Sequence, residues 1–531
     1  MKPTDVGLLF DQCAEIGTRT TVHLDRPFDI APDGGVHYDV PRLAGLVAEA
    51  AGWLTAAGAR PGDRVAIVKD NHWDCVLLAC AAVRIGALPA LVAATLPAAT
   101  LQTMLKRLDP AVLVTCARVL RAGQDAGADL AGAARRTVSL DEPVAGAVAV
   151  CDLRGHDAPP AHRRGVDDPL VVTHTSGTTG VPKLVVHSTE TIVNRLARFE
   201  AVRWPLLATR RDDTVVNAAS FVHGRTFCWT ASVLCLAPRE IGVVTDFAPH
   251  RAAPFLHAHP PTLLEAVPAV FVRWQPLTSS EGNPFRDVRL FMSTYDAVHP
   301  PAVRAFLDAS ARRFPLWLQG WGQTETGPLT FRFLTRRSVA RAGERHPTTR
   351  DLGRPVPGRT GLRVVDPDTL VPVPRGETGL LLARTSARCP GYVGEQDRWA
   401  AKDRDGWWNT GDVGSIDRTG RVRLLDREVD VVPGLSCVEV EDVLEDRLPD
   451  VVECVVLGSV GRPPLPVLVT ASGTLDDTRW RAAVTDLPPL ADPVLMAWDD
   501  VPRTATGKVR RLALHDRLLG GTDIHGTGRW T

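Results

Sequence analysis

The sequence has no excess of charge of either sign, no closely paired cysteines and no long uninterrupted apolar segment. Its 61 Lys and Arg residues balance 61 Asp and Glu residues, so the composition gives no electrostatic case for a nucleic-acid partner or an anionic membrane. The 10 cysteines include no Cys-x-x-Cys pair, which argues against a disulfide framework and against a zinc site. We expect reduced, mostly buried thiols in an enzyme that acts on small molecules.

The most apolar stretch, residues 76–94, is interrupted by Arg84, Gly86 and Pro89. A membrane-spanning helix needs about 20 predominantly apolar residues, so no membrane span is expected here. The first residues also lack a basic segment followed by an apolar core. We therefore expect a non-secreted, cytoplasmic protein without a membrane partner.

The order of predicted elements indicates an α/β fold. Residues 43–57, closed by Gly58, have the pattern of a helix, and strand patterns lie at 65–68, 87–92 and 112–115. They alternate with helical patterns, one capped by Asp70 or Asn71 and one over residues 98–108. Such alternation is typical of largely parallel sheets. Residues 121–164 are rich in Ala, Gly, Asp and Pro, which predicts surface helix and loop.

At 531 residues the chain exceeds the size of a single hydrophobic core, so at least two domains are expected. From residue 352 short β-like segments alternate with turns, which predicts a small β-rich subdomain. Helix and strand patterns follow the pair Asp426 and Arg427. We therefore predict an N-terminal core of residues 1–426 with mainly parallel sheets, followed by a small α+β C-terminal domain of residues 427–531.

A polar segment between two apolar runs has the composition of a phosphate-binding loop. Runs rich in β-branched residues at 170–173 and 184–187 predict flanking strands. The glycines of the loop permit N–H groups to approach phosphate oxygens, the hydroxyls donate hydrogen bonds, and the lysine adds charge. The ending of a Walker A loop is missing, and a polar hairpin turn is the alternative interpretation. The residues assigned to phosphate binding are Thr175, Ser176, Gly177, Thr178, Thr179, Gly180 and Lys183.

Four further stretches follow this loop. They are Gln-Gly-Trp-Gly-Gln-Thr-Glu-Thr at 319–326, Asn-Thr-Gly-Asp at 409–412, Asp-Arg at 426–427 and Pro-Arg-Thr-Ala-Thr-Gly-Lys at 502–508. Together with the loop, and in this order, they resemble the adenylate-forming ligases, a superfamily that includes acyl-CoA synthetases, peptide-synthetase adenylation domains and luciferase-like enzymes. The resemblance covers nearly the whole chain.

The second stretch has a physical rationale in nucleotide chemistry. ATP must be held with its α-phosphorus in line with a nucleophile, and the charge of the reactants and of the departing pyrophosphate must be neutralised. Trp321 offers a flat face for adenine, and Gly322 beside it lets the nucleotide lie close to the backbone. Thr324 offers a hydroxyl for the α-phosphate, and Glu325 offers a hard oxygen ligand for Mg²⁺. We therefore expect ATP and Mg²⁺ as cofactors, with Thr324 and Glu325 as catalytic residues.

The resemblance assigns roles to three residues further along the chain. Asp412 matches the aspartate that accepts hydrogen bonds from the ribose hydroxyls, and Arg427 matches the ribose-contacting arginine at the start of the hinge. Lys508 matches the catalytic lysine that bridges carboxylate and α-phosphate oxygens, delivered by a mobile C-terminal domain. Taken alone, Asp412 would be interpreted as a surface turn and Lys508 as a solvated side chain.

The substrate pocket is predicted from four positions. His223 lies where many members of the resembled family carry a histidine that lines the carboxylate pocket, although a structural histidine is an equally good interpretation. Gly320 is assigned to the same pocket. Tyr295 and Asp296 stand where most relatives have a glycine-rich turn, which disfavours a long acyl tunnel and favours a compact or aromatic acid. A turn that is merely rebuilt is the alternative.

Two other segments bear on function. Residues 428–435 reach the Glu-Val-Glu helix start at 439–441 sooner than in acyl-CoA synthetases, so the loop that helps to form the pantetheine tunnel is shortened. This argues against CoA as the acceptor. His257 and His259 lie among prolines without further ligands nearby in the sequence, so we expect a loop there and not a metal site.

We predict an ATP-dependent ligase of secondary metabolism that activates a small aromatic or cyclic carboxylic acid as acyl-AMP and transfers the acyl group to an amine, as amide synthetases do. An acyl-CoA ligase, or a ligase that loads a carrier protein, is the first alternative. A non-catalytic protein that binds nucleotides or acyl-adenylates is an alternative of another class, against which the retention of Glu325, Asp412 and Lys508 argues. Activation of another oxyanion, such as nitrite, stays open.

Overall fold

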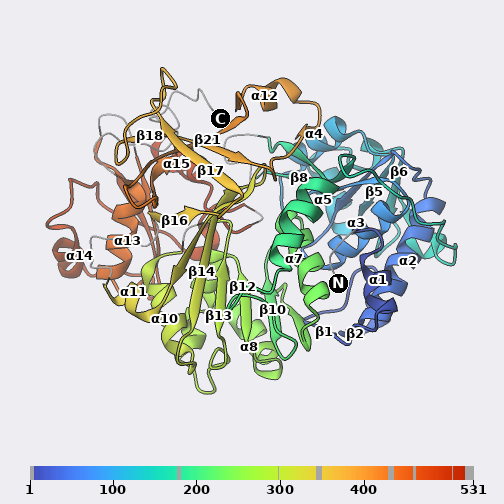
Figure 1. The fold of residues 1–531 in the computed structure, drawn as a ribbon, viewed down its shortest axis with the longest axis horizontal. Coiled ribbons are helices and arrows are strands. Elements are labelled where there is room, and N and C mark those ends of the chain that lie inside the picture. Colours follow the sequence, from blue (N-terminus) through green and yellow to red (C-terminus); the bar gives the residue numbers. More distant parts are fainter. Residues whose placement is uncertain are drawn as a thin grey trace. The chain divides into compact units, whose positions relative to one another are not determined.

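The computed structural model describes residues 5–175, 181–296, 298–341, 350–427, 436–458, 462–504 and 506–520. The chain forms two compact units, the first comprising Met1–Glu265, Thr324–Gly327 and Ser386–Trp399 and the second comprising Ala266–Gln323, Pro328–Thr385 and Ala400–Thr531. Helices alternate with strands over most of the chain, and a smaller C-terminal domain follows, which confirms the predicted α/β class with mainly parallel sheets (Figure 1). Among the described residues, no helix is both long and apolar enough to cross a membrane.

The first unit contains a mainly parallel sheet with the strand order β19-β9-β8-β4-β3-β5-β6-β7. Neighbouring strands from β8 to β7 run parallel, whereas β9 runs antiparallel to both β8 and β19. The central strands are buried, as a parallel sheet covered by helices requires. The strands are β3 (Arg64–Val68), β4 (Leu88–Leu91), β5 (Val112–Thr115), β6 (Arg136–Ser139), β7 (Val148–Ala149), β8 (Pro169–His174), β9 (Leu184–Ser188) and β19 (Gly391–Tyr392).

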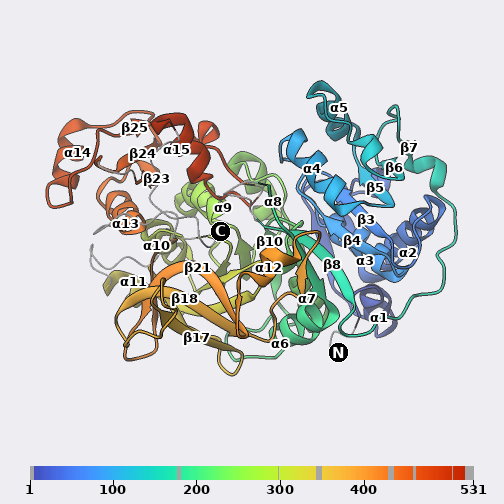
Figure 2. The same ribbon diagram turned by 90° about the horizontal axis from the view of Figure 1, so that it is seen from above.

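Helices cover both faces of this sheet (Figure 2). α1 (Leu9–Glu15), α2 (Val40–Ala56) and α3 (Asp74–Arg84) lie on one face, and α4 (Ala98–Leu108) and α5 (Ala117–Asp125) lie on the other. Leu101, Leu105 and Leu108 of α4 recur at helical spacing, and they pack against Val68 and Val92 in one hydrophobic cluster. α4 and β5 begin and end at the residues predicted from the sequence.

The starts of α2 and α3 differ from the prediction. Asp39 caps α2 by accepting a hydrogen bond from the backbone N–H of Arg42, so that helix begins before residue 43. The prediction that Asp70 or Asn71 caps α3 is wrong. The side chain of Asn71 instead donates to the carbonyl of Ala219 and accepts from the backbone N–H of Phe221.

The expectation of surface helix and loop over residues 121–164 is also wrong in part. β6 and β7 extend the sheet there, and Thr137, Val138 and Ser139 are buried. Their pattern was missed because short, partly polar strands near the edge of a sheet lack the apolar run of a central strand.

A second set of strands in the first unit has the order β10-β11-β1-β2. Their bounds are Thr214–Ala218 for β10, Glu240–Val243 for β11, Thr21–Leu24 for β1 and His37–Asp39 for β2. The helical segments nearby in the sequence are a π-helix (Glu190–Ala197), α6 (Arg198–Glu200), α7 (Gly224–Leu236) and α8 (Pro249–Ala258). The loop expected at His257 and His259 is instead the end of α8, because Pro249 occupies the first turn, where a missing N–H costs nothing.

The second unit begins with parallel strands and continues with antiparallel ones. β13 and β14 run parallel, and the pairs β15–β16, β16–β22, β22–β21, β21–β18 and β18–β17 run antiparallel, which confirms the predicted β-rich subdomain. The strands are β13 (Leu290–Ser293), β14 (Leu316–Gln323), β15 (Gly327–Leu334), β16 (Asp351–Pro355), β17 (Thr360–Val365), β18 (Thr378–Thr385), β20 (Asp403–Arg404), β21 (Trp407–Ile416) and β22 (Val422–Arg427). The second unit also contains α9 (Pro268–Trp274), α10 (Pro300–Ala309) and α11 (Arg336–Arg341). β12 (Leu263–Ala266) and α12 (Gln396–Ala400) have most of their residues in the first unit.

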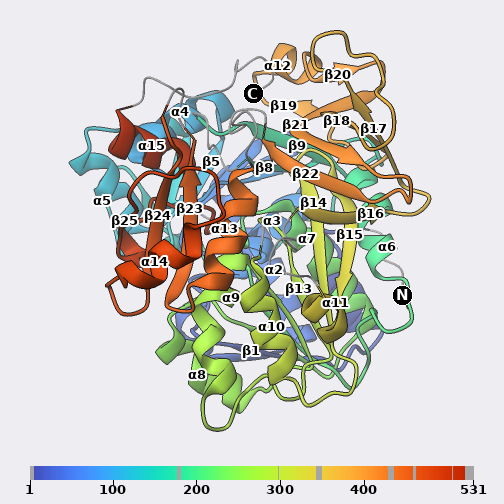
Figure 3. The same cartoon turned by 90° about the vertical axis from the view of Figure 1, so that its left-hand side faces the viewer.

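The C-terminal part of the second unit has a sheet and hydrophobic clusters of its own (Figure 3). Its elements are α13 (Cys437–Arg447), β23 (Val451–Leu457), β24 (Leu465–Thr470), α14 (Asp477–Val484), β25 (Val494–Leu495) and α15 (Arg511–Leu519). Leu444 of α13 packs with Val456 of β23 and Leu468 of β24. The domain boundary after residue 426 stays a prediction.

Candidate active site

The predicted phosphate loop joins two antiparallel strands, β8 and β9. Two hydrogen bonds close its base: the N–H of Thr175 donates to the carbonyl of Lys183, and the N–H of Lys183 donates to Oγ1 of Thr175, each over 3.1 Å. The two ends of the segment are therefore held together, as a loop that encloses a ligand requires. Five of its assigned residues, Ser176, Gly177, Thr178, Thr179 and Gly180, lie outside the described residues.

Glu325, the predicted Mg²⁺ ligand, is buried and accepts a hydrogen bond from a tyrosine. The hydroxyl of Tyr392 donates to Oε1 of Glu325 over 2.6 Å. Burial, followed by the charge of Glu325, raises the pKa of Tyr392 far above its ordinary value, so the hydroxyl keeps its proton and acts as the donor. The Nζ atom of Lys183 lies 5.6 Å from the centroid of the Tyr392 ring, within reach of a cation–π interaction.

Tyr392 was not predicted from the sequence. It lies on β19, opposite Val185 of β9, and this pairing brings it beside Lys183. Its partner Glu325 lies 67 residues away along the chain, so no local motif joins the two. The first unit thus brings three residues together: Lys183 and Glu325, which were predicted, and Tyr392, which was not.

Histidines near this group have identifiable structural roles. Burial lowers the pKa of His187 to about 4, so its ring is neutral, and its Nε2 lies 3.1 Å from Oγ1 of Thr173. His223 is the N-cap of α7, where Nδ1 accepts a hydrogen bond from the backbone N–H of Arg225 over 3.1 Å. This bond accounts for a histidine at the position, and the assignment of His223 to a substrate pocket stays a prediction. Thr324 is half-buried.

In the second unit Asp412 is buried on β21, not on an exposed turn. The side-chain amide of Gln323, at the end of β14, donates to the carbonyl of Thr410 over 2.5 Å and to Oδ2 of Asp412 over 3.4 Å. The indole N–H of Trp408 donates to Oε1 of Gln323 over 3.1 Å, which fixes the orientation of that amide. Asp412 and Arg427 are directly opposite in the β21–β22 register. Gln323 therefore holds the carboxylate of Asp412, a contact that the sequence did not predict.

Gly320, Trp321 and Gly322 lie on β14. Trp321 is half-buried and packs against a hydrophobic cluster that includes Leu352 and Val422. These apolar contacts restrict the position of the Trp321 side chain. Its contact with adenine, and the roles of Gly320 and Gly322, stay predictions.

The turn after β13 carries Tyr295 and Asp296. Tyr295 has a φ of 86°, a backbone conformation that normally requires glycine. Such a conformation costs of order 1–3 kcal/mol and persists only where surrounding structure enforces it. The turn therefore combines a glycine-type backbone with a bulky side chain, and Asp296 beside it is exposed.

Lys508 lies on a tight turn in the C-terminal part of the second unit. Its backbone N–H donates to Oγ1 of Thr504 over 3.1 Å, and its carbonyl accepts from the N–H of Thr504 over 2.8 Å. Gly507, with a φ of 79°, allows the turn to approach α9, because a Cβ atom there would lie 2.8 Å from Cβ of Ala269. Arg503 anchors the turn through an ion pair with Glu453.

The predicted residues are thus divided between the two units: Thr175, Lys183 and Glu325 belong to the first, and Trp321, Asp412 and Lys508 belong to the second. Their assembly into one site stays a prediction.

Comparison with known proteins identifies the family of the chain. Residues 19–393 match the family described as AMP-binding enzyme. The chain is 39% identical to 3-amino-2-hydroxy-4-methoxybenzoate diazotase from Streptomyces cremeus over 97% of this chain and 96% of that protein. It is 25% identical to 3-aminoavenalumate diazotase from Streptomyces sp. over 92% and 91% of the two chains.

Among solved structures, an anthranilate CoA ligase in complex with anthranoyl-AMP has the same fold, with a TM-score of 0.80, 20% sequence identity and coverage of 98% of each chain. The family match spans more than half of the chain, and the first relative matches nearly its whole length. The chain therefore belongs to the AMP-binding enzyme family and is an AMP-forming ligase of the adenylate-forming superfamily.

Proposed function

We propose that the protein is an ATP-dependent diazotase that adenylates nitrite and transfers the nitrosyl group to the primary amine of an aromatic acid. The observation that carries this proposal is the 39% identity, along nearly the whole of both chains, to a protein named as an aminobenzoate diazotase. A second protein named as a diazotase is similar over more than nine-tenths of each chain. In this proposal the group that attacks ATP is nitrite and not the carboxylate expected from the sequence.

The proposed reaction begins with adenylation of nitrite. An oxygen of nitrite attacks the α-phosphorus of ATP, pyrophosphate leaves, and nitrosyl-AMP forms. The lone pair of an aryl amine then attacks the nitrosyl nitrogen, the N–O bond to AMP breaks, and AMP leaves with that oxygen. The nitrosated amine loses a proton to give an N-nitrosamine, which then takes up a proton on its oxygen and loses water to give the diazonium group. The protein must therefore hold ATP, a small anion and an aromatic amine.

Residues of the first unit fit the triphosphate and its metal ion. We assign the β and γ phosphates to Lys183 and to the loop that begins at Thr175, and the α-phosphate to the hydroxyl of Thr324. The carboxylate of Glu325 is buried and is held through Oε1 by the hydroxyl of Tyr392, which fits a hard oxygen ligand for Mg²⁺. Bound Mg²⁺ would neutralise phosphate charge as pyrophosphate departs.

Residues of the second unit fit the nucleoside and the transition state. The ribose hydroxyls are assigned to Asp412, whose carboxylate Gln323 holds in place, and to Arg427. Adenine is assigned to the face of Trp321, beside Gly322. Lys508 would bridge the attacking oxygen and the α-phosphate, and we propose that residues 427–531 act as the domain that delivers it.

The proposed substrate pocket is small. Tyr295 places an aromatic ring on a turn with a glycine-type backbone, and Asp296 adds a carboxylate next to it. Nitrite requires far less room than an acyl chain, and an aromatic amine can stack on a tyrosine ring. His223 and Gly320 are assigned to the same pocket. Tyr295 is the position at which we expect selectivity for the amine to be set.

Amide synthesis from a small aromatic carboxylic acid is the second candidate, and the shortened segment at residues 428–435 favours an amine over CoA in that case as well. Both candidates share attack of an amine on an adenylate. They differ in the oxyanion that ATP activates. Transfer to CoA or to a carrier protein is the further alternative.

The test is a reaction panel with the purified protein, ATP and Mg²⁺. One arm supplies nitrite with aminobenzoic acids, and matched arms supply aromatic carboxylic acids with amines, CoA or carrier protein. We expect pyrophosphate release that depends on nitrite, and a diazonium product that forms an azo dye with an added coupling reagent. Pyrophosphate release with a carboxylic acid in the absence of nitrite, with an amide or thioester as product, would overturn the diazotase assignment.

A further inference from the structure

Two histidines face each other at one end of the β10-β11-β1-β2 set of strands. His23 of β1 and His37 of β2 are direct partners in the antiparallel register, so their side chains lie on the same face. Their Nδ1 atoms are 2.9 Å apart, a hydrogen-bond distance. One ring therefore donates to the other, and this bond restricts the orientation of His23.

A carboxylate comes to the same face from the strand on the other side of β1. β11 runs parallel to β1, with Gly242 opposite His23 and Glu240 two residues earlier on the same face. Glu240 accepts hydrogen bonds from Nε of Arg239 over 3.0 Å and from Oγ1 of Thr214 over 3.2 Å. Thr214 thereby orients the carboxylate, whereas the side chain of Arg239 is 61% exposed and can turn into solvent.

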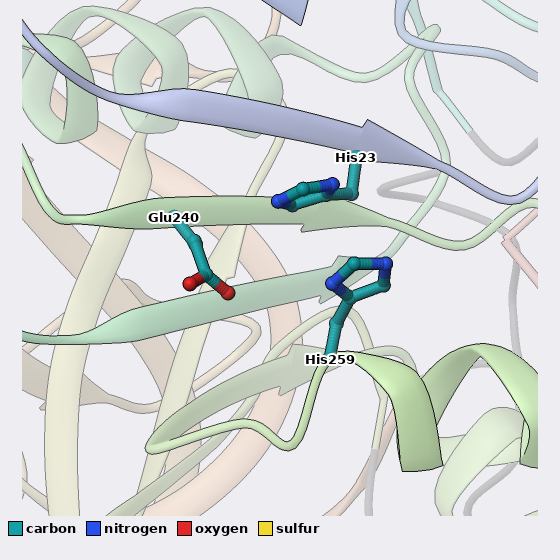
Figure 4. Close-up of side chains that lie close together, drawn as sticks. All are labelled: His23, Glu240 and His259. Carbon is teal, nitrogen blue, oxygen red and sulfur yellow. The ribbon is translucent and has the colours of Figure 1, made fainter. Parts of the chain in front are cut away.

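The third group is His259, the C-cap of α8. Gly242 allows α8 to pack closely against β11, because a Cβ atom at this position would lie 3.1 Å from the ring of Phe255 in α8. Phe255 in turn contacts the ring of His259, with centroids 5.0 Å apart. The rings of His23 and His259 stack with centroids 3.9 Å apart, and both face the carboxylate of Glu240 (Figure 4).

We propose that His23, Glu240 and His259 form a binding site for a divalent transition-metal ion of the Zn²⁺ class, with His37 as a positioning residue that holds His23. One nitrogen or oxygen atom from each of the three ligands lies within 4.8 Å of the others. Two imidazoles and one carboxylate are a donor set that suits Zn²⁺, Co²⁺ or Ni²⁺, whereas Mg²⁺ and Ca²⁺ prefer oxygen ligands alone. Water would complete a tetrahedral coordination shell.

The three ligands must move closer together to bind an ion. With ligand bonds of about 2.0–2.2 Å, atoms around a tetrahedral ion lie roughly 3.3 Å apart, so the group must contract and the two rings must turn out of their stack. All three side chains are half-buried.

Such an ion would join three segments that are far apart in the sequence. His23 lies on β1, Glu240 on β11 and His259 at the end of α8. One bound ion would therefore cross-link the helix to two strands of the first unit. Folding would then be coupled to metal binding, because only the folded chain brings the three ligands together.

The test uses the full-length protein, freed of any histidine tag and treated with a chelator. Zn²⁺ alone is titrated in competition with a chromophoric chelator, and Co²⁺ alone is followed by its visible absorption, which reports tetrahedral coordination. We expect about one equivalent of Zn²⁺ per chain, at least tenfold weaker binding in His259→Gln and in Glu240→Gln, and binding weaker by about 10–100-fold in His37→Gln. Melting temperature measured with and without Zn²⁺ should rise in the wild type and not in His259→Gln.

His257→Gln is the matched control, because His257 is an exposed histidine on the same helix, two residues from His259. It should bind Zn²⁺ as the wild type does. Glu240→Gln conserves the shape of the side chain, so it tests the site even if His259→Gln fails to fold by circular dichroism. Equal Zn²⁺ affinity in Glu240→Gln and His257→Gln, or no tetrahedral Co²⁺ spectrum in the wild type, would overturn the proposal.

Discussion

Replacing Tyr392 by Phe removes one hydroxyl group and keeps the ring, so it isolates the bond that holds Glu325. That hydroxyl donates to Oε1 of Glu325 over 2.6 Å, and both side chains are buried. A hydrogen bond to a charged group contributes about 1.5–3 kcal/mol, and each 1.4 kcal/mol is about a factor of ten in an equilibrium constant. If the bond positions Glu325 for catalysis, kcat/KM for ATP should fall roughly 10–100-fold in Tyr392→Phe. The melting temperature should also fall by a few degrees.

The matched control is Tyr38→Phe. Tyr38 is also buried, but its hydroxyl makes no hydrogen bond within the part of the chain that the structure describes. Pyrophosphate release and thermal denaturation are measured for both variants beside the wild type. Tyr38→Phe should keep the wild-type rate and melt at the same temperature or slightly higher. If the two variants are indistinguishable in rate and in melting temperature, the reasoning that Tyr392 positions Glu325 is wrong.

Three further predictions concern the second unit. Lys508→Ala should lower pyrophosphate release by roughly 10²–10³-fold while calorimetry shows nearly unchanged ATP binding, because the lysine acts in the transition state; a normal rate would contradict its role. Asp412→Asn should weaken ATP binding roughly tenfold, because a neutral amide accepts ribose hydrogen bonds less strongly than a carboxylate; an unchanged dissociation constant would contradict the ribose assignment. Burial alone would lower the pKa of His299, but Glu445 and the 2.6 Å bond to Asp442 raise it to about 10. The stabilisation from this charge is complete below its ordinary pKa of 6.5 and is lost as the pH rises through 10, so melting temperature should fall more between pH 7 and pH 10 in the wild type than in His299→Gln; parallel curves would contradict this.

Local sequence patterns predicted those helices and strands whose bounds depend mainly on the spacing of their own apolar residues. α4 and β5 begin and end at the predicted residues, since apolar spacing and burial agree there. The cap of α3 was wrong because Asn71 bonds to residues about 150 positions away, and a distant partner overrides a local preference. β6 was missed because a strand near the edge of a sheet needs few apolar residues.

The same distinction applies to the candidate sites. Glu325 and Asp412 stand in recognisable motifs, and both are buried next to hydrogen-bond donors. The residues that hold them, Tyr392 and Gln323, were not singled out, because each acts through a partner that is far away in the sequence. His259 was dismissed as a metal ligand for lack of neighbours, yet the fold supplies them from residues 23 and 240.

The most direct test of nitrite activation uses nitrite labelled with ¹⁸O in both oxygens. Adenylation joins one labelled oxygen to the α-phosphorus, and attack of the amine on nitrogen leaves that oxygen on AMP. Mass spectrometry of AMP from a reaction with ATP, Mg²⁺ and an aromatic amine should therefore show one ¹⁸O atom in the phosphate, in amounts that match the diazonium formed. Diazonium formation with unlabelled AMP, or labelled nitrite recovered unused while AMP accumulates, would contradict the mechanism.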